Sequence, residues 1–497
     1  MKHRVILKNS TATKSVEVDD GANLLQCIRE QVDNFYAPCG GNGTCGKCRV
    51  HIPGEGHVTS CLYYVSKDLE VILPNRVEMQ VLSTQYKLTK ILPSNPGKAL
   101  MDLATIPYGL AIDIGTTTIV YYVVNLLFGS VVDIISMTNP QSKFGADVIS
   151  RINYGATTPK GLAELQQVLV FSLNDAIDQF CSNNQISPTE FVKIAVVGNT
   201  IMLHNLLGVD ALPIAHAPFT PQFTDAKTMP ASELGIHIHP KGELILAPSL
   251  SAYVGADILA GLASIDCSKL GKNFLFIDIG TNGEIVLATP EKKLACATAA
   301  GPAFEGANIS CGMAALPGAI SEYSEHGFKV ISGTSPTGIC GSGLVDIIAT
   351  MLETGALEPD GNIAEDFIIC TNDFSTTIVL SQQDVREIQL AKSAVLSGIN
   401  RLMAIAGLSM DELDHVLLAG GFGNYLNIAN AIRMGLLPQV PLEKYIQVGN
   451  SAGSGAVLAL KSEVFMTELE TLKEEINYIE LSTDDEFTME FAMNMYF

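Results

Sequence analysis

The sequence has few basic residues. Lys and Arg together number 30 against 52 Asp and Glu, which gives a formal net charge of −22 at pH 7. Nucleic acids and anionic membrane surfaces both bind clustered basic residues, so this balance disfavours both as partners. Apolar runs long enough to span a bilayer, about 18 residues, are also missing. The first residues lack the long apolar stretch and the small-residue cleavage pattern of a secretory signal, so we expect a cytoplasmic protein.

The chain nevertheless has enough apolar residues to form large cores. It has 497 residues, of which 47% are hydrophobic and 16% are charged, a composition typical of globular proteins with two or three domains. The negative charge is unevenly distributed, because residues 1–85 contain nine basic and nine acidic side chains. Residues 463–497 contain ten acidic side chains and one basic side chain, and we interpret this acidic C-terminal tail as a solvated helical face.

A disulfide framework is not expected either. The chain has 11 cysteines, an odd number, and such frameworks are typical of short secreted chains. Four cysteines instead cluster near the N-terminus with the spacing C-x5-C-x2-C-x12-C, namely Cys39, Cys45, Cys48 and Cys61. Clustered cysteines in a reducing compartment indicate a metal site.

The residues around these cysteines predict a compact β-grasp domain over residues 1–85. Strand-like VILKN and SVEVDD precede helix-like NLLQCIREQ, and strand-like LEVIL follows the cysteine loop. Glycines in the loop leave room for the backbone to wrap around inorganic sulfide and to aim N–H groups at it. These glycines are Gly40, Gly41, Gly43 and Gly46. The loop resembles that of the [2Fe–2S] ferredoxins, with an unusually close fourth cysteine, and the resemblance implies that the four cysteines bind such a cluster.

Other kinds of site fit the cysteine loop less well. Zinc prefers two close cysteine pairs, and only Cys45 and Cys48 form one. Residues 41–46 match G-x-G-x-x-G but lack the strand, helix and downstream acidic residue of a dinucleotide site. The same stretch partly matches the P-loop motif, but Cys48 occupies the position of the Ser or Thr that binds magnesium. Zinc therefore stays as the alternative to iron and sulfide.

A larger α/β segment follows residues 86–107, which contain three prolines and which we interpret as a linker. In this segment GLAIDIGTTTIVYYVVN (109–125) and NFLFIDIGTNGEIVLA (273–288) share an apolar strand, Asp, Ile, Gly and Thr, and then another apolar strand. KIAVVGNT (193–200) and HVLLAGGFGN (415–424) form a second repeated pair, each a buried strand with a glycine turn. Duplicated units predict a domain over 108–462 with two related subdomains, about 108–265 and 272–462, that face a cleft.

Each repeated turn carries groups suited to phosphate. Backbone N–H groups and hydroxyls at a hairpin tip bind phosphate oxygens, whereas the preceding aspartate repels them and instead orients Mg²⁺ or a water. Asp113 and Asp278 are therefore the catalytic candidates, and the sequence does not assign the water to either. The nucleotide-binding candidates are Gly115, Thr116, Thr117, Thr118, Gly280, Thr281, Asn282, Gly283, Gly420, Gly421, Phe422 and Gly423. The alternative is a pair of purely structural hairpins.

This order of motifs resembles the actin/Hsp70/sugar-kinase ATPase superfamily over about residues 108–460. The resemblance implies a duplicated actin-like (ribonuclease H-like) fold that binds ATP and Mg²⁺. It also implies adenosine-binding roles for Glu387 and Lys392, which lie on an amphipathic helix expected over 381–407. Ordinary surface charge on that helix is the alternative.

The chain as a whole resembles the reductive activators of corrinoid proteins. The resemblance includes ATAAGPAFEGANISCGMAALPGAI (297–320), GICGSGLVD (338–346) and the helix over 381–400. It implies an ATP-hydrolysing iron–sulfur oxidoreductase that transfers one electron from the [2Fe–2S] cluster to cob(II)amide on a partner corrinoid protein of a methyltransferase system, giving cob(I)amide. An upstream low-potential electron donor and a homodimer are also implied. The chain lacks the Asp-x-His-x-x-Gly signature of many B12-binding domains, so we expect the corrinoid on the partner.

Three other functions stay open from the residues alone. In the first, ATP gates electron transfer to a different low-potential acceptor. In the second, nucleotide switches a redox-sensing regulator without turnover. The third is a small-molecule kinase with an accessory cluster, for which neither a substrate site nor a general base is recognisable in the sequence.

Overall fold

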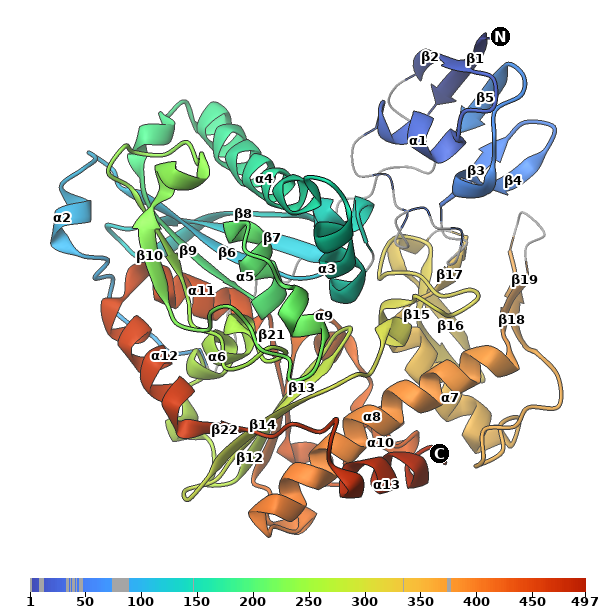
Figure 1. The fold of residues 1–497 in the computed structure, drawn as a ribbon. Helices are drawn as coiled ribbons and strands as arrows, with labels where there is room; N and C mark the ends of the chain where they lie inside the picture. Colours follow the sequence, from blue (N-terminus) through green and yellow to red (C-terminus); the bar gives the residue numbers. More distant parts are fainter. Residues whose placement is uncertain are drawn as a thin grey trace.

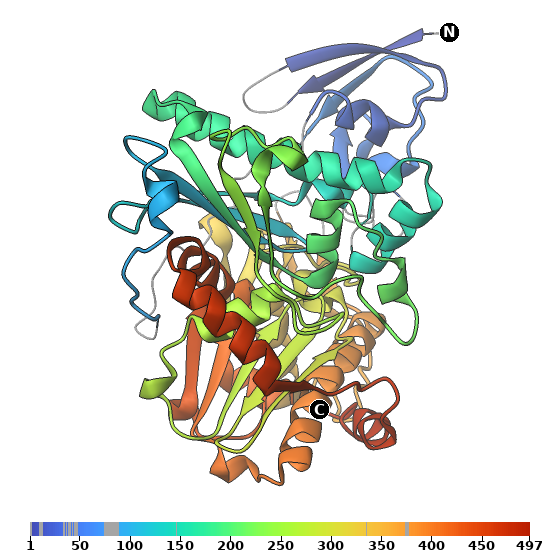
Figure 2. The same cartoon turned by 60° about the vertical axis from the view of Figure 1, so that its left-hand side comes forward.

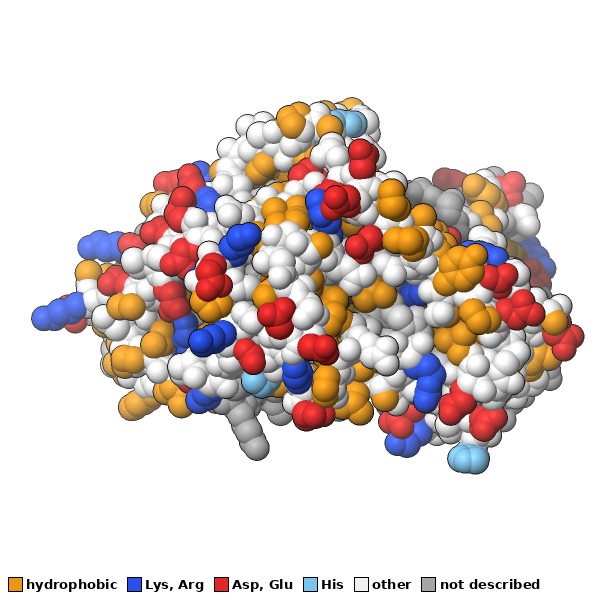
Figure 3. All heavy atoms as spheres, turned by 90° about the horizontal axis from the view of Figure 1, so that it is seen from below, with side chains coloured by type: hydrophobic (Ala, Val, Ile, Leu, Met, Phe, Trp, Pro, Cys, Tyr) orange, Lys and Arg blue, Asp and Glu red, His pale blue; other side chains and the backbone are white. Residues whose placement is uncertain are grey.

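The computed structural model describes residues 2–8, 13–32, 35, 37, 41, 43, 48–73, 89–145, 147–333, 335–372 and 377–497. A small N-terminal sheet, blue in Figure 1, stands beside helix α3 (Val148–Thr157) of a much larger body built around two six-stranded sheets, which Figure 2 shows from another side. On the face shown in Figure 3, acidic, basic and apolar side chains are interspersed. No helix in the described part of the chain is long and apolar enough to cross a membrane.

The N-terminal sheet is mixed, with the strand order β2-β1-β5-β3-β4. Its strands are β1 (Lys2–Lys8), β2 (Thr13–Asp19), β3 (Arg49–Ile52), β4 (Gly56–Thr59) and β5 (Leu69–Ile72). β1 pairs antiparallel with β2 and parallel with β5. Alternate residues of β1 face inward, and Val5 and Leu7 join one core with Leu24 and Ile28 of helix α1 (Leu24–Arg29). The helix begins where the side chain of Asn23 accepts the N–H of Gln26.

The two large sheets repeat one strand pattern, with the orders β10-β11-β9-β6-β7-β8 and β21-β20-β12-β13-β14-β22. The first contains β6 (Tyr108–Ile114), β7 (Thr118–Asn125), β8 (Ser130–Thr138), β9 (Phe191–Gly198), β10 (Lys227–Pro230) and β11 (Glu243–Leu246). The second contains β12 (Phe274–Ile279), β13 (Gly283–Ala288), β14 (Lys293–Thr298), β20 (His415–Ala419), β21 (Tyr445–Gly449) and β22 (Ile476–Tyr478). β6 and β12 each form an antiparallel hairpin with the next strand and pair in parallel with a later buried strand, β9 or β20. The repeated strand–turn–strand units predicted from the sequence therefore form equivalent hairpins, one in each sheet.

Two helices, α6 (Ala256–Ala263) and α11 (Ser451–Lys461), pack against each other where the two large sheets meet. Small residues make this contact close, since a β-carbon on Gly455 would lie 2.3 Å from the carbonyl oxygen of Ala260. Gly261 of α6 faces Phe276 of β12, whereas α11 packs on β6 and β9. The helix pair is therefore a tightly packed link between the two halves of the larger body.

Other helices pack around the large sheets. In the first half, α4 (Gly161–Asn184) meets β7 through the Tyr121–Ser172 hydrogen bond, α5 (Thr200–Leu207) packs on β9, and α3 packs on α4. In the second half, α8 (Gln382–Ala406) packs on β13 and β14, whereas α7 (Gly341–Thr354) and α10 (Ile428–Arg433) pack on each other. Both β6 and β9 are almost wholly apolar and buried because helices and strands enclose them on both faces. Smaller elements include α2 (Lys98–Met101), β15 (Ala319–Ser324), β16 (Gly327–Val330), β17 (Gly338–Ile339), β18 (Phe367–Thr371), β19 (Thr377–Leu380) and α9 (Gly420–Tyr425).

The described part of the linker region, residues 89–107, lies along the joined helices. The N–H of Lys90 donates to the carbonyl of Ser264 just after α6, and the N–H of Asn95 donates to the carbonyl of Lys461 at the end of α11. Lys193 of β9 is buried, and its Nζ donates to the carbonyl oxygen of Pro96 at 3.2 Å. This stretch is therefore attached to the larger body.

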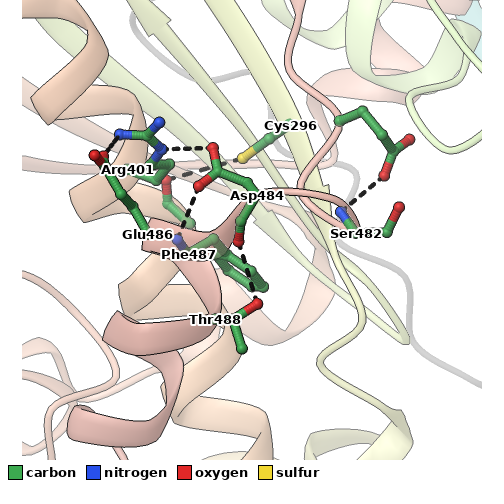
Figure 4. A network of polar contacts seen from close by, with 9 residues as sticks. Cys296, Arg401, Ser482, Asp484, Glu486, Phe487 and Thr488 are labelled. Atoms are coloured by element: carbon green, nitrogen blue, oxygen red, sulfur yellow. Dashed lines mark hydrogen bonds and ion pairs between the residues drawn. The ribbon is translucent and has the colours of Figure 1, made fainter.

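The acidic tail is also part of the larger body. Helix α12 (Glu463–Glu475) buries Phe465 and Leu469, β22 extends the second sheet, and α13 (Asp485–Met493) packs on α8. Figure 4 shows Arg401 of α8 paired with Asp484, at 2.7 Å from Nε to Oδ2, and with Glu486. The tail thus combines a buried apolar side with ion pairs, in addition to the solvated acidic face expected from its composition.

We expect Gly455→Ala to destabilise the protein, although alanine favours a helix interior by about 1 kcal/mol. The new methyl group would press on the α6 backbone at Ala260, and overpacking costs about 1–3 kcal/mol. Chemical unfolding followed by far-UV circular dichroism measures the change, with Ser454→Ala on the same helix as the control. A Gly455→Ala protein as stable as this control would contradict the tight helix contact.

Candidate functional site

The first candidate phosphate hairpin follows Asp113, which lies near the end of β6. Its turn is closed by the Gly115 N–H, which donates to the carbonyl of Thr118 at 2.9 Å. A β-carbon on Gly115 would lie 2.7 Å from that same oxygen, so the turn requires glycine. Asn139 donates from Nδ2 to the Gly115 carbonyl at 2.8 Å, and Asn199 donates to Thr116 Oγ1 at 3.0 Å. The hairpin tip is therefore held in one conformation by neighbouring loops.

The second hairpin has the same construction at the end of β12. Asp278 precedes a turn in which the Gly280 N–H donates to the carbonyl of Asn282 at 2.8 Å. Thr298 of β14 donates from Oγ1 to the carbonyl of Gly283 at 3.2 Å. Thr281 lies at the tip and donates to Glu305 Oε2 at 2.9 Å.

The glycine-rich motif over 420–423 lies beside the second hairpin. Gly420 has a φ of +78°, and a β-carbon there would lie 2.4 Å from Asp278 Oδ1. Phe422 stacks on Phe304, with ring centroids 5.0 Å apart and an interplanar angle of 17°. The structure therefore brings together two of the predicted motifs that are about 140 positions apart in the sequence, because β12 and β20 are neighbours.

The two predicted aspartates influence each other's charge. Burial raises the pKa of Asp113 to about 6, and the hydrogen bond from Asn450 Nδ2, at 3.1 Å, partly offsets this rise. Burial and the charge of Asp113 together raise the pKa of Asp278 to about 7. The two carboxylates thus approach a common site from the ends of β6 and β12 and disfavour each other's ionisation.

Two further carboxylates that sequence reasoning missed belong to the same site. Burial and the charges of Asp113 and Asp278 raise the pKa of Asp257 to about 8, and Asp257 opens helix α6. Glu284 directly follows the second hairpin, and burial together with Asp257 and Asp278 raises its pKa. The position of Glu284 directly after the Thr281–Gly283 turn could have identified it as a site residue. No motif around Asp257 indicates its role.

Arg151 of α3 supplies positive charge beneath the first hairpin. This side chain is fully buried and donates from Nη2 to the carbonyl of Thr116 at 2.7 Å and from Nε to the carbonyl of Gly145 at 3.0 Å. Burial lowers its pKa to about 10. The site thus combines several carboxylates, one guanidinium, and hydroxyl and N–H groups of the kind that bind phosphate. Such a site suits a polyphosphate bound with a divalent cation, because the cation relieves the repulsion among the carboxylates.

Glu387 and Lys392, the predicted adenosine-binding pair, both lie on α8. Glu387 is partly exposed, whereas Lys392 is buried and bonds through Nζ to the carbonyl of Tyr496. Its Nζ also lies 4.9 Å from the centroid of the Phe497 ring. Burial lowers the pKa of Lys392 to about 8. The end of the acidic tail therefore covers this lysine, and the adenosine-binding role of the pair stays a prediction.

The cysteine loop is only partly described, because Cys39 and Cys45 lie outside the described residues. Cys48 and Cys61 are both buried in one small apolar cluster with Leu25 and Ala37, and the Cys61 N–H donates to Cys48 Sγ at 3.4 Å. Gly41 has a φ of +102°, and a β-carbon there would lie 2.8 Å from Leu25. Among the described residues, no three or more His, Cys, Asp or Glu side chains are placed to hold a metal. A close glycine backbone and a sulfur that accepts an N–H fit a cluster ligand environment.

The raised pKa values predict that the protein without nucleotide loses stability as the pH rises. The ordinary aspartate pKa is about 3.9, and the folded values are about 6 for Asp113 and about 7 for Asp278. Between these limits the folded state binds more protons than the unfolded state, so the free energy of unfolding falls with rising pH. Urea unfolding between about pH 5 and pH 7 should show this slope, and Asp278→Asn should flatten it. Equal slopes in the two proteins would contradict the assigned burial of Asp278.

Two family models match the larger body. Residues 272–497 match the model described as the C-terminal domain of RACo, the ASKHA domain, and residues 108–269 match the RACo middle region. The two models together cover both large sheets and the tail.

Relatives with established names match over most of the chain. The corrinoid activation enzyme RamQ of Eubacterium limosum is 33% identical over 447 residues, which are 84% of this chain and 74% of that protein. The [Co(II) methylated amine-specific corrinoid protein] reductase of Methanosarcina barkeri is 26% identical over 395 residues, which cover 72% of this chain and 70% of that protein. The solved structure of a reductive activator for corrinoid, iron–sulfur protein aligns with a TM-score of 0.72 and 29% identity, covering 99% of this chain and 98% of that one. Its hairpins, its glycine motif and these matches together show that this chain belongs to the RACo family of corrinoid activators.

Proposed function

We propose that this protein reductively activates a partner corrinoid protein, using ATP to drive a one-electron transfer that converts cob(II)amide to cob(I)amide. The observation that carries the proposal is the pair of aspartate-bearing hairpins facing one site, in the same chain as a loop with four clustered cysteines. The names of the relatives support it, since they describe activation or reduction of corrinoid proteins.

ATP hydrolysis is the first part of the proposal. The phosphates would lie between the two hairpin tips, where Thr116–Thr118 and Thr281 offer hydroxyls and backbone N–H groups. Asp113 and Asp278 would orient Mg²⁺ or its bound waters, because a carboxylate alone would repel the phosphate oxygens. The glycine-rich start of α9, next to Asp278, would admit the nucleoside end of ATP.

The N-terminal domain is the second part. Cys39, Cys45, Cys48 and Cys61 would hold a [2Fe–2S] cluster, which serves as a one-electron carrier when bound. The mixed sheet with α1 packed on it suits a β-grasp ferredoxin domain. The N–H of Cys61 reduces electron density on Cys48 Sγ, and hydrogen bonds of this kind tune the potential of a cluster.

ATP hydrolysis and electron transfer would be coupled through the cleft that is predicted between the two subdomains. For a one-electron couple, a change of about 60 mV corresponds to about 1.4 kcal/mol. A cleft that closes on ATP can bind the partner differently in its two oxidation states, and this difference in affinity shifts the partner's effective potential. We expect the corrinoid itself to stay on the partner, and an upstream low-potential donor to reduce this protein in the cytoplasm.

Cys48→Ser tests the cluster assignment. The change should abolish most of the visible absorption of the anaerobically reconstituted protein, because serine is a poor ligand for iron–sulfide clusters. ATP binding, measured by isothermal titration calorimetry, should persist. Cys267→Ser, at an exposed cysteine, is the matched control. Full cluster absorption in Cys48→Ser would remove Cys48 from the ligand set.

The proposed reaction is tested by optical titration of a partner corrinoid protein in the cob(II)amide state under anoxic conditions. With a chemical reductant and Mg²⁺–ATP, the wild-type protein should produce the cob(I)amide spectrum. Without ATP, or with a nonhydrolysable analogue, it should not, since the transfer is uphill. Equal reduction with and without ATP would contradict the energetic role of ATP, and nucleotide binding without turnover would favour a regulator.

A further inference from the structure

Glu305 lies at the tip of the second phosphate hairpin and near the first. Thr281 Oγ1, at the tip of the second hairpin, donates to Glu305 Oε2 at 2.9 Å. The charge of Arg151, which donates to the Thr116 carbonyl of the first hairpin, also acts on this carboxylate. Thr281 and Arg151 come from different halves of the larger body, so Glu305 lies where the two halves meet and where phosphates are expected.

A rigid turn presents Glu305. The residue ends the 3₁₀ helix η7 (Pro302–Glu305), between Gly301 at φ +75° and Gly306 at φ +80°. A β-carbon on Gly306 would lie 2.4 Å from the backbone nitrogen of Met313, so the turn requires glycine there. The preceding residue, Phe304, is buried and stacks on Phe422 of α9. The position of the Glu305 carboxylate is therefore fixed by the fold and by the Thr281 hydroxyl.

The charge around Glu305 suits a group that exchanges a proton. Burial raises its pKa, and the hydrogen bond from Thr281 and the charge of Arg151 partly offset this rise. Asp113 and Asp278 occupy different places, at the roots of the hairpins, where Asp113 accepts from Asn450 and Asp278 lies under Gly420. Of these three carboxylates, Glu305 is the one bonded to a hairpin tip.

We propose that Glu305 is the general base for ATP hydrolysis, an inference that rests on the proposed function. A water held by the Glu305 carboxylate attacks the γ-phosphorus and transfers a proton to the carboxylate. The bond between the γ-phosphorus and the bridging oxygen breaks, and ADP and phosphate are formed. The proton then passes from Glu305 to solvent as phosphate leaves. Because a carboxylate repels phosphate oxygens, a water between them is the arrangement that lets Glu305 and ATP share the tips.

Glu305→Gln separates this role from a structural one. Glutamine keeps the length of the side chain and its carbonyl oxygen accepts the Thr281 hydroxyl, but it does not accept the proton. We expect kcat for Mg²⁺–ATP hydrolysis to fall at least about 100-fold, the usual contribution of a general base, while the dissociation constant for Mg²⁺–ATP changes less than about threefold. Turnover is measured with and without the oxidised corrinoid protein, and binding by calorimetry.

Two other variants complete the test. Glu291→Gln, at an exposed position in the turn between β13 and β14, should keep the wild-type rate and affinity. Glu305→Asp keeps the negative charge but has a shorter side chain, so it should also lower kcat with little change in the affinity for Mg²⁺–ATP. This variant replaces Glu305→Gln in the test if the glutamine variant does not fold. Wild-type kcat in Glu305→Gln, or a loss confined to affinity, would overturn the proposal for Glu305 alone. Wild-type protein that binds ATP without hydrolysing it would overturn both this inference and the ATP-driven function.

Discussion

Partly buried carboxylates at the ends of two equivalent strands are the constraint around which the larger body is organised. Asp113 and Asp278 occupy the same place in the repeated hairpins, and each raises the electrostatic cost of ionising the acids around it. A polyphosphate alone would add to this repulsion, whereas one bound with a divalent cation relieves it. The hairpin tips, by contrast, offer hydroxyls and N–H groups. In the proposed function, groups that would bind a cation therefore lie at the strand ends, and groups that would bind phosphate lie at the tips.

Asp113 is connected to the helix pair that links the two halves. Asn450 donates to Asp113 and to Tyr122 Oη, and its own side-chain oxygen accepts the N–H of Gly453 to cap α11. A cation or proton at Asp113 therefore changes the surroundings of the residue that begins α11. Since α11 packs on α6 through backbone-to-backbone contact at Gly455, a change at its start has a direct route to the other half. Such a route is what an ATP-dependent change in partner affinity requires.

Several site residues come from segments without a recognisable nucleotide-binding motif, so their place in the site could not be predicted from the sequence. Asn450 lies 337 positions from Asp113 in the sequence, and Arg151 and Glu305 reach the hairpins from a helix and a turn elsewhere in the fold. Lys392 was predicted from its helix, but its buried contact with the chain end depends on how α13 packs on α8. The assignment of Cys39 and Cys45 as cluster ligands stays a prediction, because these residues lie outside the described part of the chain.

Features that depend on neighbouring residues could be predicted from the residue pattern. The Asp–Ile–Gly–Thr turns and the caps of α1 and α8 are of this kind, because a tight turn or a cap involves only a few adjacent residues. The groups that meet at the site from distant segments could not be predicted in this way: Asp257 and Glu284 beside the two aspartates, Arg151 beneath one hairpin, and Glu305 at the tip of the other. Their meeting depends on the pairing of strands and the packing of helices over long separations, which local residue patterns do not encode.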